Sequence, residues 1–343
     1  MADTGWPGCA KSLKGVILDL CGVLYDSGEG DGVAIPGSIE AVKRLKESDL
    51  QLRFCTNETQ ATREKFVAKL QRLGFDISVP EVFPPAPAAI AVLKERGLRP
   101  HLLVHEGLLP EFDTVDKTNP NCVVIGDAAE NFSYQNLNEA FRVLIGLERP
   151  VLFSLGQGRY YKETDGLKLD VGVYMKALEY ACDLKAEVIG KPSPTFFQSV
   201  LGDMGLKPNE ALMIGDDLVN DVGGAQCCGM KGVQVRTGKY RPSDERHPTV
   251  SADATVDNLA QAVDVILGQR GRGWGAVLWH ERCTSQNRQI QAKRRETPDC
   301  DRRRHGGQPG PGRGRDPRSE RARSLRNPPT RRRLEQSSLC VAL

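Results

Sequence analysis

Four short segments of the sequence place reactive side chains directly after strand-like apolar runs. They are Asp19-Leu20-Cys21, Thr56-Asn57, Gly190-Lys191-Pro192 and Gly215-Asp216-Asp217-x-x-x-Asp221. In open parallel sheets, ligands bind outside the carboxyl ends of the strands, so these groups are expected to meet at one edge. Three carboxylates within six residues repel one another unless a cation lies among them. Hard oxygen ligands beside a phosphate indicate Mg²⁺ as that cation.

Each segment also has a plainer structural interpretation. Asp19 could cap a loop, Thr56-Asn57 could cap a helix, and Lys191 could be an exposed turn lysine. In the functional interpretation, Asp19 is a nucleophile or metal ligand, and the donors of Thr56-Asn57 bind phosphate oxygens. Pro192 restricts the backbone around Lys191, so the ammonium would be fixed where it neutralises a carboxylate–phosphate pair.

The elements that must position these groups alternate between strands and helices. Apolar runs predict strands at 16–20, 50–55, 101–105, 123–125, 151–154, 187–189, 211–214 and 232–235. Helical patterns follow Ser38, which is expected to be an N-cap, and occur before Gly74, at 195–201 and at 259–267. This alternation predicts an α/β fold with a mainly parallel sheet.

The charge of the chain is divided unevenly. The 343 residues have a net charge of +3, but from Arg270 onward there are nineteen Lys and Arg against seven Asp and Glu. Residues 1–269 are therefore acidic, and the Gly-, Arg- and Pro-rich segment 268–343 is predicted to be a disordered basic tail because it cannot bury enough apolar surface. The composition excludes collagen-like, disulfide-scaffold and membrane-spanning proteins.

The cysteines and the N-terminus indicate where the protein resides. Ten cysteines are scattered with no C-x-x-C pair, and no signal-peptide core precedes the first strand-like run. Free thiols are typical of a reducing compartment, so we expect a cytoplasmic protein with access to the nucleus.

The order of the four segments resembles the haloacid dehalogenase superfamily of phosphohydrolases. The segments 53–58, 71–75, 158–164 and 215–226 extend the resemblance, which covers residues 13–267. It implies a Rossmann-like core at 1–87 and 187–267, with an α/β cap domain inserted at 88–186. It also implies a homodimer that acts on phosphorylated small molecules or on proteins carrying phosphohistidine or phospholysine.

The resemblance also implies a role for each site residue. Asp19 would be the nucleophile that forms an aspartyl-phosphate, and its second oxygen would bind Mg²⁺. The Cys21 carbonyl and Asp216 would supply the other metal contacts, while Asp217 and Asp221 would orient metal-bound waters or Lys191. The phosphoryl group would be held by a set of side chains and main-chain groups at the strand ends, namely those of Asp19, Leu20, Cys21, Thr56, Asn57 and Lys191.

Cys21 departs from the superfamily pattern. That pattern has an aspartic acid two residues after the nucleophile, which protonates the leaving group. A thiol with a pKa of about 8.5 is a poor acid for this purpose. Phosphate leaving pyrophosphate is already a stable anion, and a nitrogen leaving group can be protonated beforehand. The sequence therefore predicts cleavage of P–N bonds and of inorganic pyrophosphate rather than alkyl esters. The thiol itself is either oxidisable, so that oxidation blocks turnover, or inert.

Two other functions stay open at this point. One is a haloacid dehalogenase-type phosphatase of small phosphate esters. The other is a nucleic-acid-binding protein that uses the basic tail, since Arg runs bind phosphate backbones. The tail lacks interleaved stacking aromatics and the acidic body repels nucleic acid, so nucleic-acid binding is the less favoured function.

Overall fold

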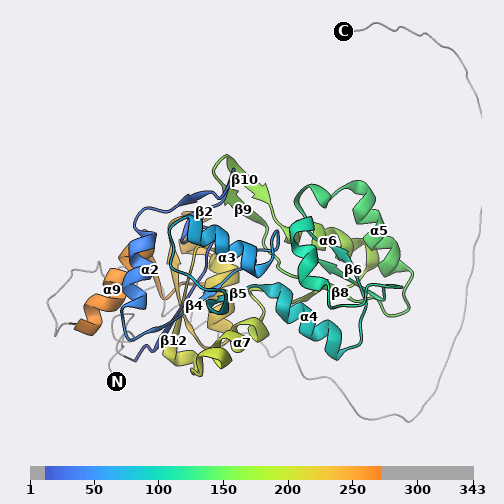
Figure 1. Ribbon diagram of the computed structural model, residues 1–343. Coiled ribbons are helices and arrows are strands. Elements are labelled where there is room, and N and C mark those ends of the chain that lie inside the picture. The colour runs from blue at the N-terminus through green and yellow to red at the C-terminus, as the bar shows by residue number, and fades with distance from the viewer. Residues whose placement is uncertain (1–11, 272–343) are drawn as a thin grey trace, which may run out of the picture. The chain divides into compact units, whose positions relative to one another are not determined.

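The structure is a computed structural model that describes residues 12–271 (Figure 1). Most of the predicted tail, and its basic triplets, lie outside these residues. The first four residues of the predicted disordered tail, 268–271, are instead helical. They continue helix α9 (Leu259–Gly271), which extends past Leu267. No helix of the described part is long and apolar enough to cross a membrane.

The larger sheet has six parallel strands in the order β14-β13-β12-β1-β4-β5. Their bounds are β1 (Gly15–Leu18), β4 (Gln51–Cys55), β5 (Val82–Phe83), β12 (Ala211–Gly215), β13 (Lys231–Val235) and β14 (Ala254–Val256). The chain extends from β1 to one side through β4 and later returns to its other side with β12. β1 is therefore the point where the strand order reverses, which is where open α/β sheets bind ligands.

Helices cover both faces of this sheet. One face packs against α2 (Ser38–Lys46), α3 (Arg63–Arg72) and α9, and the other against α7 (Pro194–Met204) and α8 (Gly224–Cys227). β1 and β12 are completely buried. Continuous burial of this kind accounts for their unbroken apolar sequences. The predicted α/β class and mainly parallel sheet are thus confirmed.

The second sheet has four parallel strands in the order β11-β8-β7-β6. They are β6 (Pro100–Leu103), β7 (Cys122–Ile125), β8 (Leu152–Ser154) and β11 (Glu187–Val188). Helix α4 (Pro85–Glu95) packs on one face, while α5 (Tyr134–Ile145) and α6 (Val171–Cys182) lie on the other. This sheet with its helices lies between the second and third reactive segments in sequence, where a cap was expected. The exact domain division remains a prediction.

Two small hairpins complete the described structure. One joins β2 (Tyr25–Asp26) to β3 (Val33–Ala34), and the other joins β9 (Tyr160–Glu163) to β10 (Gly166–Leu169). The hairpins contact each other, because the Thr164 N–H donates to the Ser27 carbonyl over 2.8 Å.

Ser38 is not the N-cap that the sequence suggested. Helix α2 begins at Ser38 itself and follows Gly37, whose φ of 83° is in the left-handed region. The Ser38 hydroxyl donates to the carbonyls of Leu24 and Ile35 instead of capping the helix. It fastens the helix start to the loop after β1, so tertiary contact replaces the local capping role.

Candidate active site

The sequence-predicted charges converge at the carboxyl ends of β1, β4 and β12. Asp19 follows β1, and Asp216 and Asp221 follow β12. A carboxylate oxygen of each lies within 4.8 Å of an oxygen of the others, and all three residues are buried. Parallel pairing of β1 with β12 aligns their ends and so brings residues nearly two hundred positions apart together.

Lys191 supplies the counter-charge to this carboxylate cluster. Its ammonium lies 2.5 Å from Asp19 Oδ1 and 2.7 Å from Asp221 Oδ1, and only 4% of its side chain is exposed. It also donates to the Cys55 carbonyl over 3.2 Å. Although burial lowers the pKa of Lys191, the two carboxylates raise it above its usual value. The exposed-turn interpretation of Lys191 is therefore wrong.

Asn57 holds this lysine through its main chain. The Asn57 side-chain oxygen accepts from the Lys191 N–H over 2.9 Å, and its amide nitrogen donates to the Lys191 carbonyl over 3.0 Å. Thr56, 2% exposed, accepts the Glu58 N–H at its hydroxyl over 3.0 Å. Neither residue caps a helix, because α3 begins later with Thr62 as its N-cap. Leu20 contributes its main chain to the loop, while its side chain packs into the core.

The segment after β12 is a single π-helical turn, η5 (Leu218–Gly223), capped by Asp217. Asp217 Oδ1 accepts the N–H groups of Val219 and Asn220, and Oδ2 accepts the Asn220 side-chain amide. Burial raises the pKa of Asp217, but the ammonium of Lys239 and these donors lower it overall. Asp217 is therefore a carboxylate beside the cluster that caps the π-helical turn and pairs with Lys239, and its orienting role remains a prediction.

Asp216 provides the test of whether a cation fits. Burial, reinforced by Asp19 and Asp221, raises the pKa of Asp216 well above its usual value. Its Oδ2 accepts the Lys239 N–H over 2.8 Å, but no group among the described residues donates to the buried Oδ1. A buried acceptor without a donor, beside two more carboxylates, fits a hard divalent cation such as Mg²⁺.

Cys21 is a poor proton donor in this environment. Its thiol donates weakly toward the Ser27 hydroxyl over 3.6 Å, and burial raises the pKa of the thiol to about 12. A thiol that stays neutral also resists oxidation, since the thiolate is the reactive form. The structure therefore favours the inert alternative over the oxidisable one.

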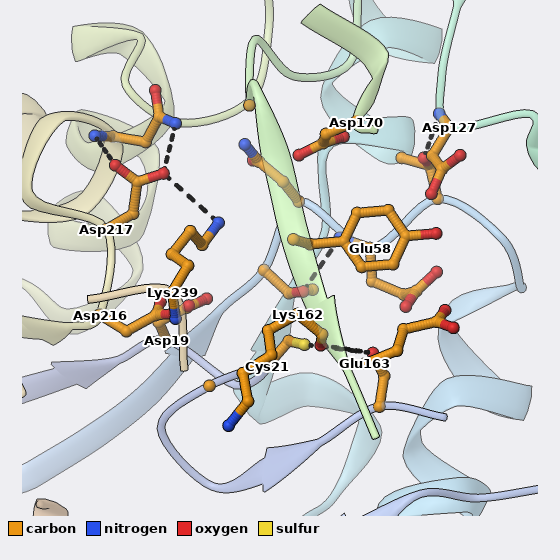
Figure 2. Close-up of a pocket in the computed structure, with 18 of the residues that line it drawn as sticks. Asp19, Cys21, Glu58, Asp127, Lys162, Glu163, Asp170, Asp216, Asp217 and Lys239 are labelled. Carbon is orange, nitrogen blue, oxygen red and sulfur yellow. Dashed lines mark hydrogen bonds and ion pairs between the residues drawn. The ribbon is translucent and has the colours of Figure 1, made fainter. Parts of the chain in front are cut away.

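A pocket of about 200 Å³ extends outward from this cluster. Its outer wall comes from the strand-end loop after β4, the β7–α5 loop and the β9 hairpin. Figure 2 shows Asp216, Asp217 and Lys239 on one side of the pocket and Glu58, Asp127 and Glu163 on the other. Several polar lining residues were not among the predicted site residues, including Glu58, Gln60, Asp127, Tyr161, Lys162, Glu163, Asp170 and Lys239.

Asp127 predicts a pH-dependent contribution to stability. The side chain is 9% exposed and accepts from Gln60 and from the Ala129 N–H. Burial raises its pKa above the unfolded value of about 3.9. A raised native pKa favours the folded state below the unfolded pKa, and this advantage is lost as the pH rises through the native value. Asp127→Asn should therefore raise the thermal midpoint at pH 7.5 more than at pH 4.

The control for this prediction is Asp113→Asn, since Asp113 is exposed. The thermal midpoint of Asp113→Asn should equal that of the unaltered protein at both pH values. Thermal unfolding followed by circular dichroism measures both variants. The prediction would be contradicted if the thermal midpoint of Asp127→Asn at pH 7.5 were lower than that of the unaltered protein at the same pH.

Comparison with known proteins identifies the family. A HAD-hydrolase-like model matches residues 188–262, and a haloacid dehalogenase-like hydrolase model matches residues 16–118. The phospholysine phosphohistidine inorganic pyrophosphate phosphatase of Danio rerio is 76% identical over 260 residues, which are 76% of this chain and 96% of that protein. The chain belongs to the haloacid dehalogenase-like hydrolases.

Two further relatives support this assignment. The Homo sapiens protein of the same name as the Danio rerio relative is 65% identical over 262 residues, or 76% of this chain and 97% of that protein. The crystal structure of 4-nitrophenylphosphatase from Thermotoga maritima has a TM-score of 0.67 and 26% identity, and covers 75% of this chain and 99% of that one. The family resemblance, and the prediction that the protein is an enzyme, are confirmed.

One part of this haloacid dehalogenase-like hydrolase carried a signal that could have been used. Thr237-Gly238-Lys239 begins two residues after the end of β13, so it lies close to a strand end like the four segments that the sequence indicated. Gly238 has a φ of 60°, and a Cβ there would lie 2.1 Å from Asp216 Oδ2. Only glycine fits, so this strand end belongs to the site as well.

Proposed function

We propose that the protein is a Mg²⁺-dependent phosphatase that cleaves P–N bonds and inorganic pyrophosphate through an aspartyl-phosphate on Asp19. The arrangement of Asp19 carries the proposal. Its carboxylate lies at the tip of the central strand, paired with buried Lys191 and within reach of two further buried carboxylates. Phosphoryl transfer depends mainly on positioning and charge neutralisation, and these groups supply both.

Each residue of the site has its own role in the proposed phosphoryl transfer. Asp19 attacks the phosphorus in line, and the Lys191 ammonium turns from the carboxylate to the oxygens of the transferring phosphoryl group. The hydroxyl of Thr56 and the main-chain donors beside it hold those oxygens, while Asn57 fixes the Lys191 backbone. Asp216, Asp19 and the Cys21 carbonyl would hold Mg²⁺. When bound, Mg²⁺ would offset the negative charge shared by the carboxylates and the phosphoryl oxygens.

The outer wall supports nitrogen leaving groups. The carboxylates of Glu58, Asp127 and Glu163 face the pocket opposite the Lys239 side. A protonated amine or imidazole is stabilised by such carboxylates, and it leaves without needing a proton from Cys21. The names of the Danio rerio and Homo sapiens relatives include phospholysine and phosphohistidine, whose nitrogen leaving groups suit this wall, and also pyrophosphate. The homodimer and the cytoplasmic or nuclear location remain predictions.

A substrate panel with and without Mg²⁺ tests the proposal. The substrates are phospholysine, phosphohistidine, pyrophosphate and glycerol phosphate as the alkyl ester. We expect turnover of the first three in Mg²⁺ and its loss in EDTA, with recovery when Mg²⁺ is restored. Ester turnover should be slower by about 10²-fold or more, which is the usual contribution of a general acid.

Cys21→Asp is the matched variant for the panel, since it supplies the acid that the family pattern has at this position. It should raise ester turnover relative to pyrophosphate turnover. Glycerol phosphate hydrolysed by the unaltered protein as fast as pyrophosphate would refute the P–N and pyrophosphate preference. It would favour instead a phosphatase of small esters.

A further inference from the structure

The loop that carries Lys239 is fixed against the loop that follows β1. The Thr237 hydroxyl donates to the Gly22 carbonyl over 2.5 Å, and a Cβ on Gly238 would lie 2.6 Å from the Gly22 Cα. The Lys239 N–H donates to Asp216 Oδ2 over 2.8 Å. The backbone of Lys239 is therefore held beside the segment that contains Cys21, the position of the missing general acid.

The Lys239 side chain brings a second ammonium to the pocket. It is 19% exposed and lies 3.3 Å from Asp217 Oδ2. Figure 2 shows it extending from the level of Asp19 and Asp216 toward Asp217. Its charge also acts on Asp170, which lines the outer part of the pocket. The ammonium therefore lies in the same pocket as Asp19, so a group that leaves from Asp19 into this pocket comes within its reach.

The ammonium groups of the other lysines in this pocket contact other partners. Lys191 is paired with Asp19 and Asp221. Lys162 pairs with Asp26 over 3.1 Å, and the Lys69 ammonium lies 4.8 Å above the Tyr25 ring.

Lys239 has a single carboxylate within ion-pair distance among the described residues. That partner, Asp217, already accepts three N–H donors from the π-helical turn. An ammonium has three N–H groups, so Lys239 retains donors for a ligand.

We propose that Lys239 binds and stabilises the anionic leaving group, and so determines that pyrophosphate is a substrate. The inference rests on the proposed function. An oxygen of Asp19 forms a bond to one phosphorus, and the bond from that phosphorus to the bridging oxygen breaks. The electron pair stays on the bridging oxygen, which leaves as inorganic phosphate. Lys239 donates a hydrogen bond to this phosphate and transfers no proton.

Lys239 should act differently on nitrogen leaving groups. The amine of phospholysine departs without negative charge, so it gains nothing from a nearby ammonium. The acidic outer wall has the opposite preference to Lys239. It repels the phosphate dianion that Lys239 attracts. Lys239 and the wall would thus serve different substrates within one pocket. Removal of Lys239 should then change the ratio between substrates rather than all activities together.

Lys239→Met tests this inference, because methionine keeps similar length without charge. Steady-state kinetics on pyrophosphate and phospholysine should show kcat/KM for pyrophosphate falling about 100-fold, the usual loss when one donor to a developing anion is removed. The value for phospholysine should change little. Lys239→Arg should restore most of the pyrophosphate activity, and thermal unfolding should show that both variants are folded.

Each outcome has a distinct meaning. An equal loss on both substrates would mean that Lys239 only holds Asp216 and Asp217 in place, and would overturn the inference. No loss on pyrophosphate would overturn it too. If the unaltered protein cleaves neither substrate, the proposed function fails first. If Lys239→Met does not fold, Lys239→Gln, which keeps a donor but not the charge, is measured on the same pair.

Discussion

Asp19→Asn is expected to abolish turnover of every substrate, with kcat falling by about 10⁴-fold or more, as when a nucleophile is removed. The asparagine amide occupies the same space but cannot form the acyl-phosphate. Its fold should survive, because Lys191 keeps Asp221 as a partner and the change removes one of three mutually repelling buried carboxylates. The variant should therefore combine a lost activity with a thermal midpoint that is unchanged or higher.

Asp217→Asn is the matched control for this prediction. It makes the same chemical change at the same edge of the sheet, but Asp217 caps the π-helical turn, pairs with Lys239, and is predicted only to orient its neighbours. Loss of such an orienting group costs about 10- to 100-fold in activity. Denaturing mass spectrometry during turnover should find a phosphoryl group on the peptide that contains Asp19, and none in the Asp19→Asn variant. Equal losses in the two variants would argue against a nucleophilic Asp19.

The predictable part of the site follows from sheet geometry. Asp19 and Asp216 come directly after β1 and β12, and parallel pairing carries those two strand ends to one edge. Their convergence therefore needs no knowledge of long-range packing. Lys191 follows β11 of the second sheet, so its arrival at this edge and its burial there depend on tertiary packing.

The wall of the pocket could not be predicted in this way. Glu58, Asp127 and Glu163 come from two loops and the exposed side of a hairpin, and no periodicity distinguishes them from solvated surface charges. Asp127 follows β7 of the second sheet and Glu163 lies in the β9 hairpin, so their approach to Glu58 after β4 depends on tertiary packing. Ser38 also shows that tertiary contacts can override a local sequence preference. Its type fits a helix cap, but the nearby carbonyls of the β1 loop take its hydroxyl.

Asn57 shows that one residue type suits more than one task. Its predicted role as a phosphate ligand stays a prediction, and its side chain makes two hydrogen bonds to the Lys191 main chain. An amide beside a strand end is suited to both tasks, so residue type alone does not decide between them. The Thr237-Gly238-Lys239 segment has no carboxylate and no strand-end motif of the kind seen at Asp19 or Asp216, so residue type alone does not indicate Lys239, although the segment lies close to the end of β13.

Lys191→Met should produce the largest combined loss of stability and activity. The ammonium is the counter-charge for Asp19 and Asp221, and all three side chains are less than 9% exposed. Removing one partner of a buried ion pair leaves uncompensated charge and costs about 3–5 kcal/mol. The free energy of unfolding, measured with urea at pH 7.5, should fall by this amount. Activity should fall by about 10³-fold, since the phosphoryl oxygens lose their fixed cation.

A second substitution separates the two losses. Lys191→Met combined with Asp221→Asn removes one of the stranded carboxylates, so it should recover part of the stability but none of the activity. Lys185→Met is the surface control, because Lys185 is 86% exposed, and it should change the unfolding free energy by less than about 0.5 kcal/mol. If Lys191→Met were as stable as this control, the buried ammonium would not be balancing the carboxylates. The attraction of Lys191 for a phosphoryl group would then have to be explained without the charge cluster.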